Sequence, residues 1–299
     1  MDMLKINNLK KSFGDKEVLK GISLSVPEKS IFGFIGKNGA GKTTTMKTIL
    51  GLMKPDEGEI YVNGEKVVFG QTSTNQYIGY LPDVPEYYSF MTPSEYLQFC
   101  GEITGLYKAE RVRRSEELLE LVGLKGEKHK IKGFSRGMKQ RLGIAQALLN
   151  RPKLLICDEP TSALDPVGRK EILDILMAVK DETTVLFSTH ILSDVERICT
   201  DIAFLNEGTV AIQGKIGDIK STYRTDEYII ETETENELKA LTSAFPYLNK
   251  TGRTILKFNE KQYSIFEVMN FITENKLAVL KIERVEPTLE SMFMEVVKK

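Results

Sequence analysis

The residues whose types and spacing point most clearly to chemistry form one stretch, Gly36 to Thr44, with the sequence Gly-Lys-Asn-Gly-Ala-Gly-Lys-Thr-Thr. It fits the phosphate-binding pattern G-x-x-x-x-G-K-[ST]. A short apolar run precedes it and apolar residues at helical spacing follow it, which places it between a strand and a helix. Backbone N–H groups of such a loop and of the first helical turn favour a polyphosphate. We therefore predict that this stretch binds a nucleoside triphosphate.

The residues of this loop have separate expected roles. Glycines permit its tight backbone, Lys42 reaches the outer phosphates, and the Thr43 hydroxyl is a ligand of Mg2+. The alternative is a glycine-rich turn with a surface lysine, which the strand-to-helix setting disfavours. The predicted nucleotide-binding residues here are Gly36, Asn38, Gly39, Ala40, Gly41, Lys42, Thr43 and Thr44.

A second pattern, the apolar run of residues 154–157, ends in the two carboxylates of Asp158 and Glu159. Asp158 fits an indirect partner of Mg2+, acting through one of the metal's ligands or through water, and Glu159 fits the general base for an attacking water. The alternative is a strand that leaves its core at an acidic turn. The phosphate loop upstream favours the catalytic interpretation, and Cys157 is expected to be a buried strand residue.

The elements that must position these residues follow an α/β alternation. Short β-type runs surround the loop up to Gly64, helical spacing dominates from residue 92, and strand signals return at 153–157, 184–188 and 201–205. We expect a first domain at 1–220 with a helical insert at about 92–150. A small accessory α+β domain is expected at 225–299, with the order β-α-β-β-α-β followed by a helix at 288–297.

Composition excludes several classes. The formal charge of −1 does not suggest a protein that binds nucleic acid through overall charge. Three distant cysteines and two histidines indicate neither a disulfide framework nor a zinc site, and a reducing cytosol is the expected compartment. The chain also lacks a signal-peptide pattern and any run of about 18 apolar residues, so we expect it to reach a membrane only through a partner.

Further motifs resemble those of the ATP-binding subunits of ABC transporters, in the same order over residues 1 to about 215. Phe134-Ser-Arg-Gly-Met-Lys-Gln-Arg141 is similar to the family's signature Leu-Ser-Gly-Gly-Gln. Ser162-Ala-Leu-Asp165 is similar to the loop that crosses its dimer interface, and Ser188-Thr-His190 to its switch histidine. The C-terminal residues 286–293 resemble the tails of bacterial subunits for drug, peptide or lantibiotic export.

The resemblance implies an α/β P-loop NTPase of ABC type, with a mixed sheet core, an antiparallel β portion and a helical insert. It implies an ATPase in which Phe13 stacks on adenine and His190 assists Glu159. Two such domains would pair head to tail around two ATP molecules, with Ser135 and Gly137 on the partner's nucleotide and Asp165 at the interface. The second domain would come from a homodimer or a paralogue, and a membrane permease would hold the pair at the inner face of the cell membrane.

Departures from the family pattern leave alternatives open. Asp83 stands where the family has a glutamine that touches Mg2+, so it is either a metal ligand or a solvated loop residue. Arg136 replaces a glycine and either attracts anions or faces solvent. The rival functions are a soluble ABC-type ATPase acting on ribosomes or nucleic acid, and a nucleotide sensor without turnover. The chain has no tandem ATPase domain or coiled-coil insert, and a sensor would not need Glu159; we expect an exporter ATPase.

Overall fold

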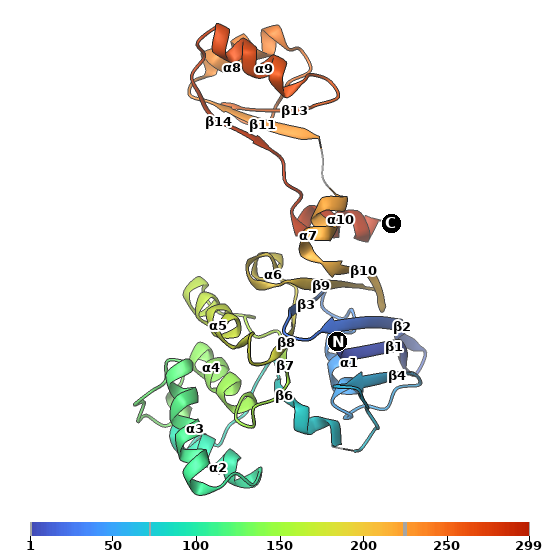
Figure 1. Cartoon of the computed structure of the whole chain (residues 1–299), viewed down its shortest axis with the longest axis vertical. Coiled ribbons are helices and arrows are strands. Elements are labelled where there is room, and N and C mark those ends of the chain that lie inside the picture. Colours follow the sequence, from blue (N-terminus) through green and yellow to red (C-terminus); the bar gives the residue numbers. More distant parts are fainter. Residues whose placement is uncertain (1, 72, 224–225, 299) are drawn as a thin grey trace. The chain divides into compact units, whose positions relative to one another are not determined.

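The computed structural model describes residues 2–71, 73–223 and 226–298. The chain divides into two compact units, one of residues 1–217 with 296–299 and one of residues 218–295. Figure 1 shows the course of the chain through both units. Within the described ranges, no helix is both long enough and apolar enough to cross a membrane.

The first unit contains two sheets. The larger has the strand order β10-β9-β3-β8-β7-β6, in which five strands are parallel and β10 is antiparallel to β9. Its strands are β3 (Ile31–Gly36), β6 (Ile78–Leu81), β7 (Leu154–Asp158), β8 (Thr184–Thr189), β9 (Asp201–Asn206) and β10 (Thr209–Lys215). The smaller sheet is antiparallel with order β2-β1-β4-β5, formed by β1 (Asp2–Phe13), β2 (Lys16–Pro27), β4 (Glu57–Val62) and β5 (Glu65–Lys66). The predicted mixed core with an antiparallel portion is confirmed.

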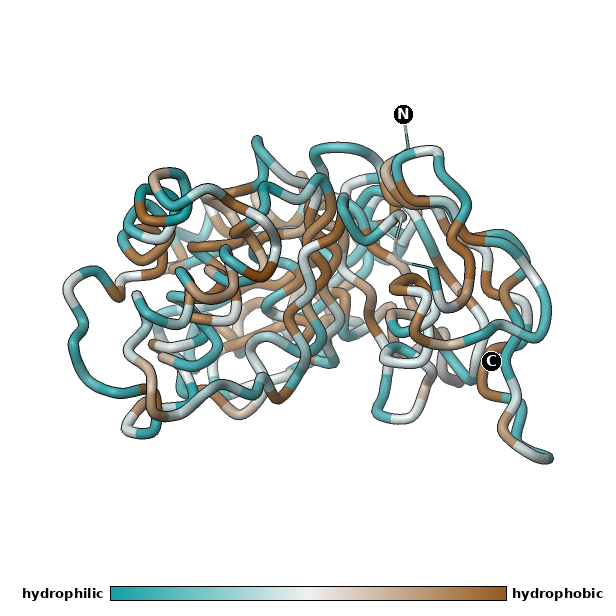
Figure 2. The backbone as a smooth tube through the Cα atoms, turned by 90° about the horizontal axis from the view of Figure 1, so that it is seen from below, coloured by the Kyte–Doolittle hydropathy of each residue, from teal (hydrophilic) through white to brown (hydrophobic). Residues whose placement is uncertain are grey.

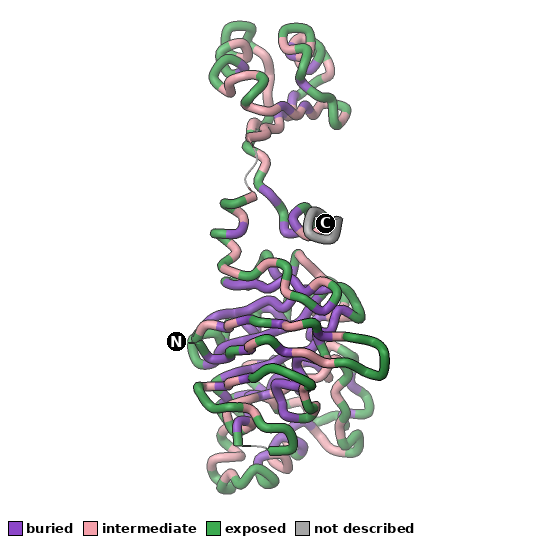
Figure 3. The backbone as a smooth tube through the Cα atoms, turned by 90° about the vertical axis from the view of Figure 1, so that its right-hand side faces the viewer, coloured by how far each residue is buried: buried purple, intermediate pink, exposed green. Residues whose placement is uncertain are grey.

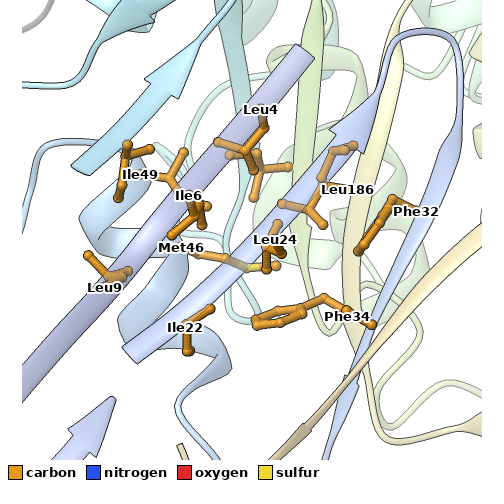
Figure 4. Packing of buried hydrophobic residues seen from close by; sticks show 14 of the residues in the cluster. Leu4, Ile6, Leu9, Ile22, Leu24, Phe32, Phe34, Met46, Ile49 and Leu186 are labelled. Carbon is orange, nitrogen blue, oxygen red and sulfur yellow. The ribbon is translucent and has the colours of Figure 1, made fainter. Parts of the chain in front are cut away.

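Helix α1 (Lys42–Ile49) packs on strands of both sheets. Figure 4 shows its Met46 and Ile49 among labelled residues of β1, β2 and β3, in one buried apolar cluster. All residues of β3, β7 and β8 are buried. Figure 3 shows buried stretches in the interior of the first unit, and Figure 2 shows hydrophobic stretches alternating with hydrophilic ones along the chain. The core thus fixes the strand before the phosphate loop and the helix after it.

The helical part of the first unit contains α2 (Pro93–Ile103), α3 (Lys108–Leu121) and α4 (Arg136–Ala147), with short 3-10 helices at Ser73–Tyr77 and Ile131–Gly133. Helix α2 begins with a capping box between Thr92 and Glu95. Helix α4 packs closely on β6, because a Cβ at Gly143 would lie 2.4 Å from Leu81 Cδ1. Helices α5 (Pro166–Val179) and α6 (Leu192–Ile198) pack on each other, and α6 also packs on β3 (Figure 1).

The second unit contains a four-stranded antiparallel sheet of order β12-β13-β11-β14. Its elements are β11 (Glu227–Thr232), α8 (Glu235–Ala244), β12 (Asn249–Lys250), β13 (Ile255–Asn259), α9 (Ile265–Glu274) and β14 (Val279–Arg284). Helices α7 (Ile216–Thr222) and α10 (Leu289–Lys298) precede and follow them in sequence. Ile230, Leu241 and Phe258 belong to a separate buried cluster. The order β-α-β-β-α-β predicted from the sequence is confirmed.

Candidate nucleotide-binding and hydrolytic site

The phosphate loop joins β3 to α1 at the carboxyl edge of the parallel strands. Gly41, directly before α1, has a φ of 110°, and a Cβ there would lie 2.6 Å from Leu19 Cδ2, so the position requires glycine. Strands β7 and β8 end at the same edge, because they run parallel to β3. The fold therefore brings Asp158, Glu159 and His190 to the loop, at the edge where open α/β sheets bind ligands.

Asp158 is buried, with 2% of its surface exposed, and both of its carboxylate oxygens accept hydrogen bonds. Thr43 Oγ1 donates to Oδ2 at 2.8 Å, and Ser188 Oγ donates to Oδ1 at 2.6 Å. Ser188 Oγ also accepts from the backbone N–H of Glu159 at 3.0 Å. The two residues predicted to hold the metal, Thr43 and Asp158, are therefore in direct contact, and Ser188 links both acidic residues.

Glu159 lies between a lysine and a histidine. Lys42 Nζ is 3.1 Å from Glu159 Oε1 and donates to the Gly36 carbonyl at 2.6 Å. His190 Nδ1 is 2.9 Å from Glu159 Oε2. Lys42 and Glu159 are largely buried and His190 is half-exposed. An anion bound by Lys42 would therefore lie beside the Glu159 carboxylate.

The backbone of Glu159 adopts a left-handed conformation with a φ of 49°. Such a conformation costs about 1–3 kcal/mol in a residue other than glycine and persists only where neighbouring groups fix it. The Ser188 hydroxyl holds the Glu159 N–H, and the Ser162 N–H donates to the Glu159 carbonyl at 3.1 Å. The turn thus directs this side chain toward the phosphate loop.

A cavity of about 440 Å³ opens at this place. It contains the mixture of groups that a polyphosphate with a divalent cation needs: loop amides, two lysines, hydroxyls and carboxylates. No group of three or more His, Cys, Asp or Glu residues able to hold a metal occurs in the described ranges. The lining residues are Lys16, Val18, Asn38, Gly39, Gly41, Lys42, Thr43, Thr44, Asp83, Asp158 and Glu159.

Asp83 lines the cavity and is also bound to helix α4. Its Oδ1 accepts from Arg136 Nη2 at 3.2 Å, and its backbone carbonyl accepts from Gln140 Nε2 at 2.8 Å. The two positions that depart from the family pattern thus meet in one ion pair. Sequence reasoning considered Asp83 and Arg136 separately and did not predict their contact.

Seven predicted site residues are not among the described residues that line the cavity. Gly36 and Ala40 belong to the phosphate loop itself and His190 contacts Glu159, whereas the other four are Phe13, Ser135, Gly137 and Asp165. Ser135 Oγ accepts from Met138 N–H at 3.2 Å and caps α4, with Gly137 in the first turn of that helix. Asp165 Oδ1 accepts from Gly168 N–H at 2.8 Å and caps α5. Phe13 ends β1 and is half-exposed. Ser135, Gly137 and Asp165 therefore lie at the starts of helices and do not line the cavity of their own chain.

Three residues of the site were not predicted as site residues. Lys16 and Val18 line the cavity from the start of β2, where no motif marks them. Ser188 contacts Asp158 because β7 and β8 pair with these two residues opposite each other. A hydroxyl at the end of an apolar strand is the signal that could have found Ser188, but strand register is needed to assign its partner.

Two further titratable side chains lie near Asp158, those of Tyr80 and Cys157. Burial raises the pKa of Tyr80, on the neighbouring strand β6, to about 12, and the charge of Asp158 adds to the effect. Burial also raises the pKa of the Cys157 thiol. Both groups therefore stay neutral at physiological pH, and Cys157 is a buried strand residue as predicted.

Two family models match successive parts of the chain. Residues 19–162 match the family model described as ABC transporter, and residues 214–297 match the C-terminal domain of DrrA1-3-like ATP-binding proteins. The chain is 37% identical to the uncharacterized ABC transporter ATP-binding protein YxlF of Bacillus subtilis, over 99% of both chains. It is 34% identical to the bacitracin transport ATP-binding protein BcrA of Bacillus licheniformis, over 99% of this chain and 97% of the relative.

Solved structures agree with the sequence comparisons. An ATP binding subunit of an ABC transporter has 34% identity and a TM-score of 0.66, over 74% of this chain and 93% of that one. A dimeric ATP-binding cassette in a post-hydrolysis state, bound to ADP and Pi, has 28% identity and a TM-score of 0.64, over 72% of this chain and 99% of that one.

Proposed function

Because the chain belongs to the ATP-binding subunits of ABC transporters, and is thus an ATPase, we propose that it pairs around two ATP molecules and drives export through a separate permease. The observation that carries the proposal is the contact series Lys42–Glu159–His190 beside Thr43 and Asp158. The Lys42 ammonium lies next to the Glu159 carboxylate, which supports the proposal that Lys42 binds phosphate while Glu159 takes a proton from water.

Each residue of the site has a proposed step. The loop amides and Lys42 bind the phosphates, and Glu159 accepts a proton from the attacking water. His190, in contact with the other carboxylate oxygen, keeps Glu159 oriented. Thr43 and Asp158 would hold Mg2+, with Asp83 at the cavity wall, and the ion would neutralise phosphate charge. Phe13 is proposed to contact the adenine.

The dimer is proposed from the residues that a single chain leaves outside its cavity. Ser135 and Gly137 begin the 12-residue helix α4, whose N-terminal N–H groups suit a phosphate. They would bind the nucleotide held by a second chain, with Asp165 at the shared interface. The partner is a second copy or a paralogue, and the dimeric cassette bound to ADP and Pi supports this arrangement.

The permease contact is proposed at the segment after β6. Val84, Tyr88 and Phe90 expose 67%, 52% and 62% of their surface there, and exposed aromatic residues are enriched at protein interfaces. This contact would hold the protein at the inner face of the membrane. Export is the proposed direction, because relatives are named for bacitracin transport and linearmycin resistance. The proposed domain division leaves residues 225–299 as an accessory domain.

The proposal is tested by separating ATP binding from turnover. Glu159→Gln should keep the ATP affinity measured by calorimetry and lose about 10²- to 10⁴-fold in hydrolysis rate, the usual contribution of a positioned base. Lys42→Ala should lose most of the ATP affinity, because it removes the buried cation of the loop. Lys153→Ala, which changes a lysine bonded to Asn63, is the control for both. Wild-type turnover in Glu159→Gln would refute the role of Glu159, and unchanged affinity in Lys42→Ala would refute the nucleotide site.

A further inference from the structure

A buried hydrogen bond lies beside the hydrolytic site without contributing to the cavity lining. Thr161 Oγ1 donates to Asp194 Oδ2 at 2.7 Å, and the two residues expose 0% and 5% of their surface. Neither belongs to the residues that line the nucleotide cavity. A carboxylate buried in the protein interior costs free energy unless its oxygens accept hydrogen bonds. Asp194 therefore depends on the Thr161 hydroxyl as a hydrogen-bond partner.

Thr161 is connected to Glu159 through the turn that follows β7. The Ser162 N–H donates to the Glu159 carbonyl at 3.1 Å, and the Leu164 N–H donates to the Thr161 carbonyl at 3.3 Å. This turn also holds Glu159 in its left-handed conformation. A shift of Thr161 would therefore be transmitted directly to the Glu159 backbone.

Asp194 is connected to His190 through the start of α6. The Asp194 N–H donates to the Ile191 carbonyl at 3.3 Å, and the Ile191 N–H donates to Thr189 Oγ1 at 2.9 Å. These bonds leave little freedom between the end of β8 and the first turn of the helix. The position of Asp194 is thus linked to the position of the histidine loop.

The two connections close a ring of contacts. One side is the 2.9 Å contact between Glu159 and His190, which is accessible to solvent on the histidine side. The opposite side is the buried bond between Thr161 and Asp194. Because solvent competes with the exposed contact, the buried bond is the one able to fix the turn against the helix.

We propose that Thr161 and Asp194 are positioning residues for ATP hydrolysis: their bond holds the turn after β7 against α6 and so aligns Glu159 with His190. This inference rests on the proposed role of Glu159 as the base. It assigns to Thr161 and Asp194 an effect on turnover and none on ATP binding, because neither residue touches the cavity.

The test compares three threonine variants of the full-length protein. Thr161→Val removes the hydroxyl and should lower kcat by about 10- to 100-fold, the scale of a small misplacement of a reacting group, with the ATP dissociation constant unchanged. Thr161→Ser keeps the hydroxyl and should restore most of kcat. Thr183→Val is the matched control: Thr183 is 3% exposed and donates to the Pro152 carbonyl at 2.7 Å, but it precedes β8, at the strand end opposite His190.

All variants are assayed at a temperature where circular dichroism shows each of them folded, and Thr161→Ala takes the place of Thr161→Val if the latter does not fold. Combining Thr161→Val with Asp194→Ala should reduce kcat no further than the more damaging single change, because both substitutions remove the same hydrogen bond.

Wild-type kcat in Thr161→Val, or an equal loss of kcat in Thr183→Val, would overturn the inference. Glu159→Gln, measured in parallel, separates the proposed role of Glu159 from the positioning role of Thr161. Normal turnover in Glu159→Gln would refute the role of Glu159 as the base. An inactive Glu159→Gln together with a fully active Thr161→Val would refute only the positioning role.

Discussion

At the scale of single residues, Asp83 pairs with Arg136 and also faces the proposed Mg2+ site. Its carboxylate is 3.2 Å from the Arg136 guanidinium and lines the cavity proposed to hold Mg2+. Both side chains are nearly half-exposed, and such a pair contributes at most about 1 kcal/mol. Arg136 therefore holds Asp83 weakly enough for a divalent ion to compete for it.

This competition predicts opposite effects for the two partners. Asp83→Asn should raise the Mg2+ concentration needed for half-maximal ATPase activity, because it removes a negative charge from the cavity wall. Arg136→Ala should lower that concentration, because it frees the carboxylate. Asp56→Asn, which changes an exposed carboxylate paired with Lys11, is the control. An identical Mg2+ dependence in wild type and Asp83→Asn would place Asp83 outside the metal site.

Residues of the site were predictable where the information is local. Lys42 and Thr43 belong to one short motif, and Asp158 and Glu159 end one apolar run. The contacts Ser188–Asp158 and Arg136–Asp83 join positions 30 and 53 residues apart. They depend on strand register and on the packing of α4, which periodicity does not specify.

At the scale of elements, helix α4 and the segment after β6 are joined at several points. Besides the contacts of Asp83, Tyr87 Oη donates to the Lys139 carbonyl at 2.5 Å, and its ring packs edge-on against Tyr96. Tyr88, the next residue, is exposed. Tyr87 thus packs inside the first unit, whereas Tyr88 is available for the proposed permease contact, and the sequence alone does not distinguish the two tyrosines.

Tyr88→Glu should therefore release the protein from membranes that contain the permease while basal ATPase activity is retained. Tyr87→Glu should lower the thermal unfolding midpoint, because it places a charge in a largely apolar packing site and removes the bond to α4. Tyr247→Glu, at an exposed tyrosine of the second unit, is the control. Sedimentation with membranes and an ATPase assay check this, and joint loss of membrane binding and activity in Tyr88→Glu would show that Tyr88 has a structural role.

At the scale of the whole molecule, the two units have separate apolar clusters. Every residue that lines the nucleotide cavity belongs to the first unit. The strand and helix order of the second unit was predictable because its turns and apolar runs alternate clearly. Its proposed accessory role rests on different grounds, since residues 225–299 contain no histidine, no cysteine and no phosphate-binding motif in the sequence.

Deleting residues 224–299 should leave Mg-ATP binding intact, because the chain then ends after α7 and retains the whole cavity. Calorimetric titration with Mg-ATP checks this, and circular dichroism must show that the shortened protein is folded. A folded, shortened protein that no longer binds ATP would assign the second unit a direct part in the site.

The dimer proposed above requires that Ser135 and Gly137 bind the nucleotide held by a second chain. The most direct measurement is the molar mass of Glu159→Gln by light scattering after size exclusion, with and without saturating Mg-ATP. We expect Glu159→Gln to have the mass of two chains with Mg-ATP and of one chain without it. Adding Ser135→Glu, which blocks the phosphate contact, should return the mass with Mg-ATP to that of one chain. A protein that binds Mg-ATP and keeps the mass of one chain would contradict pairing between two copies of this chain.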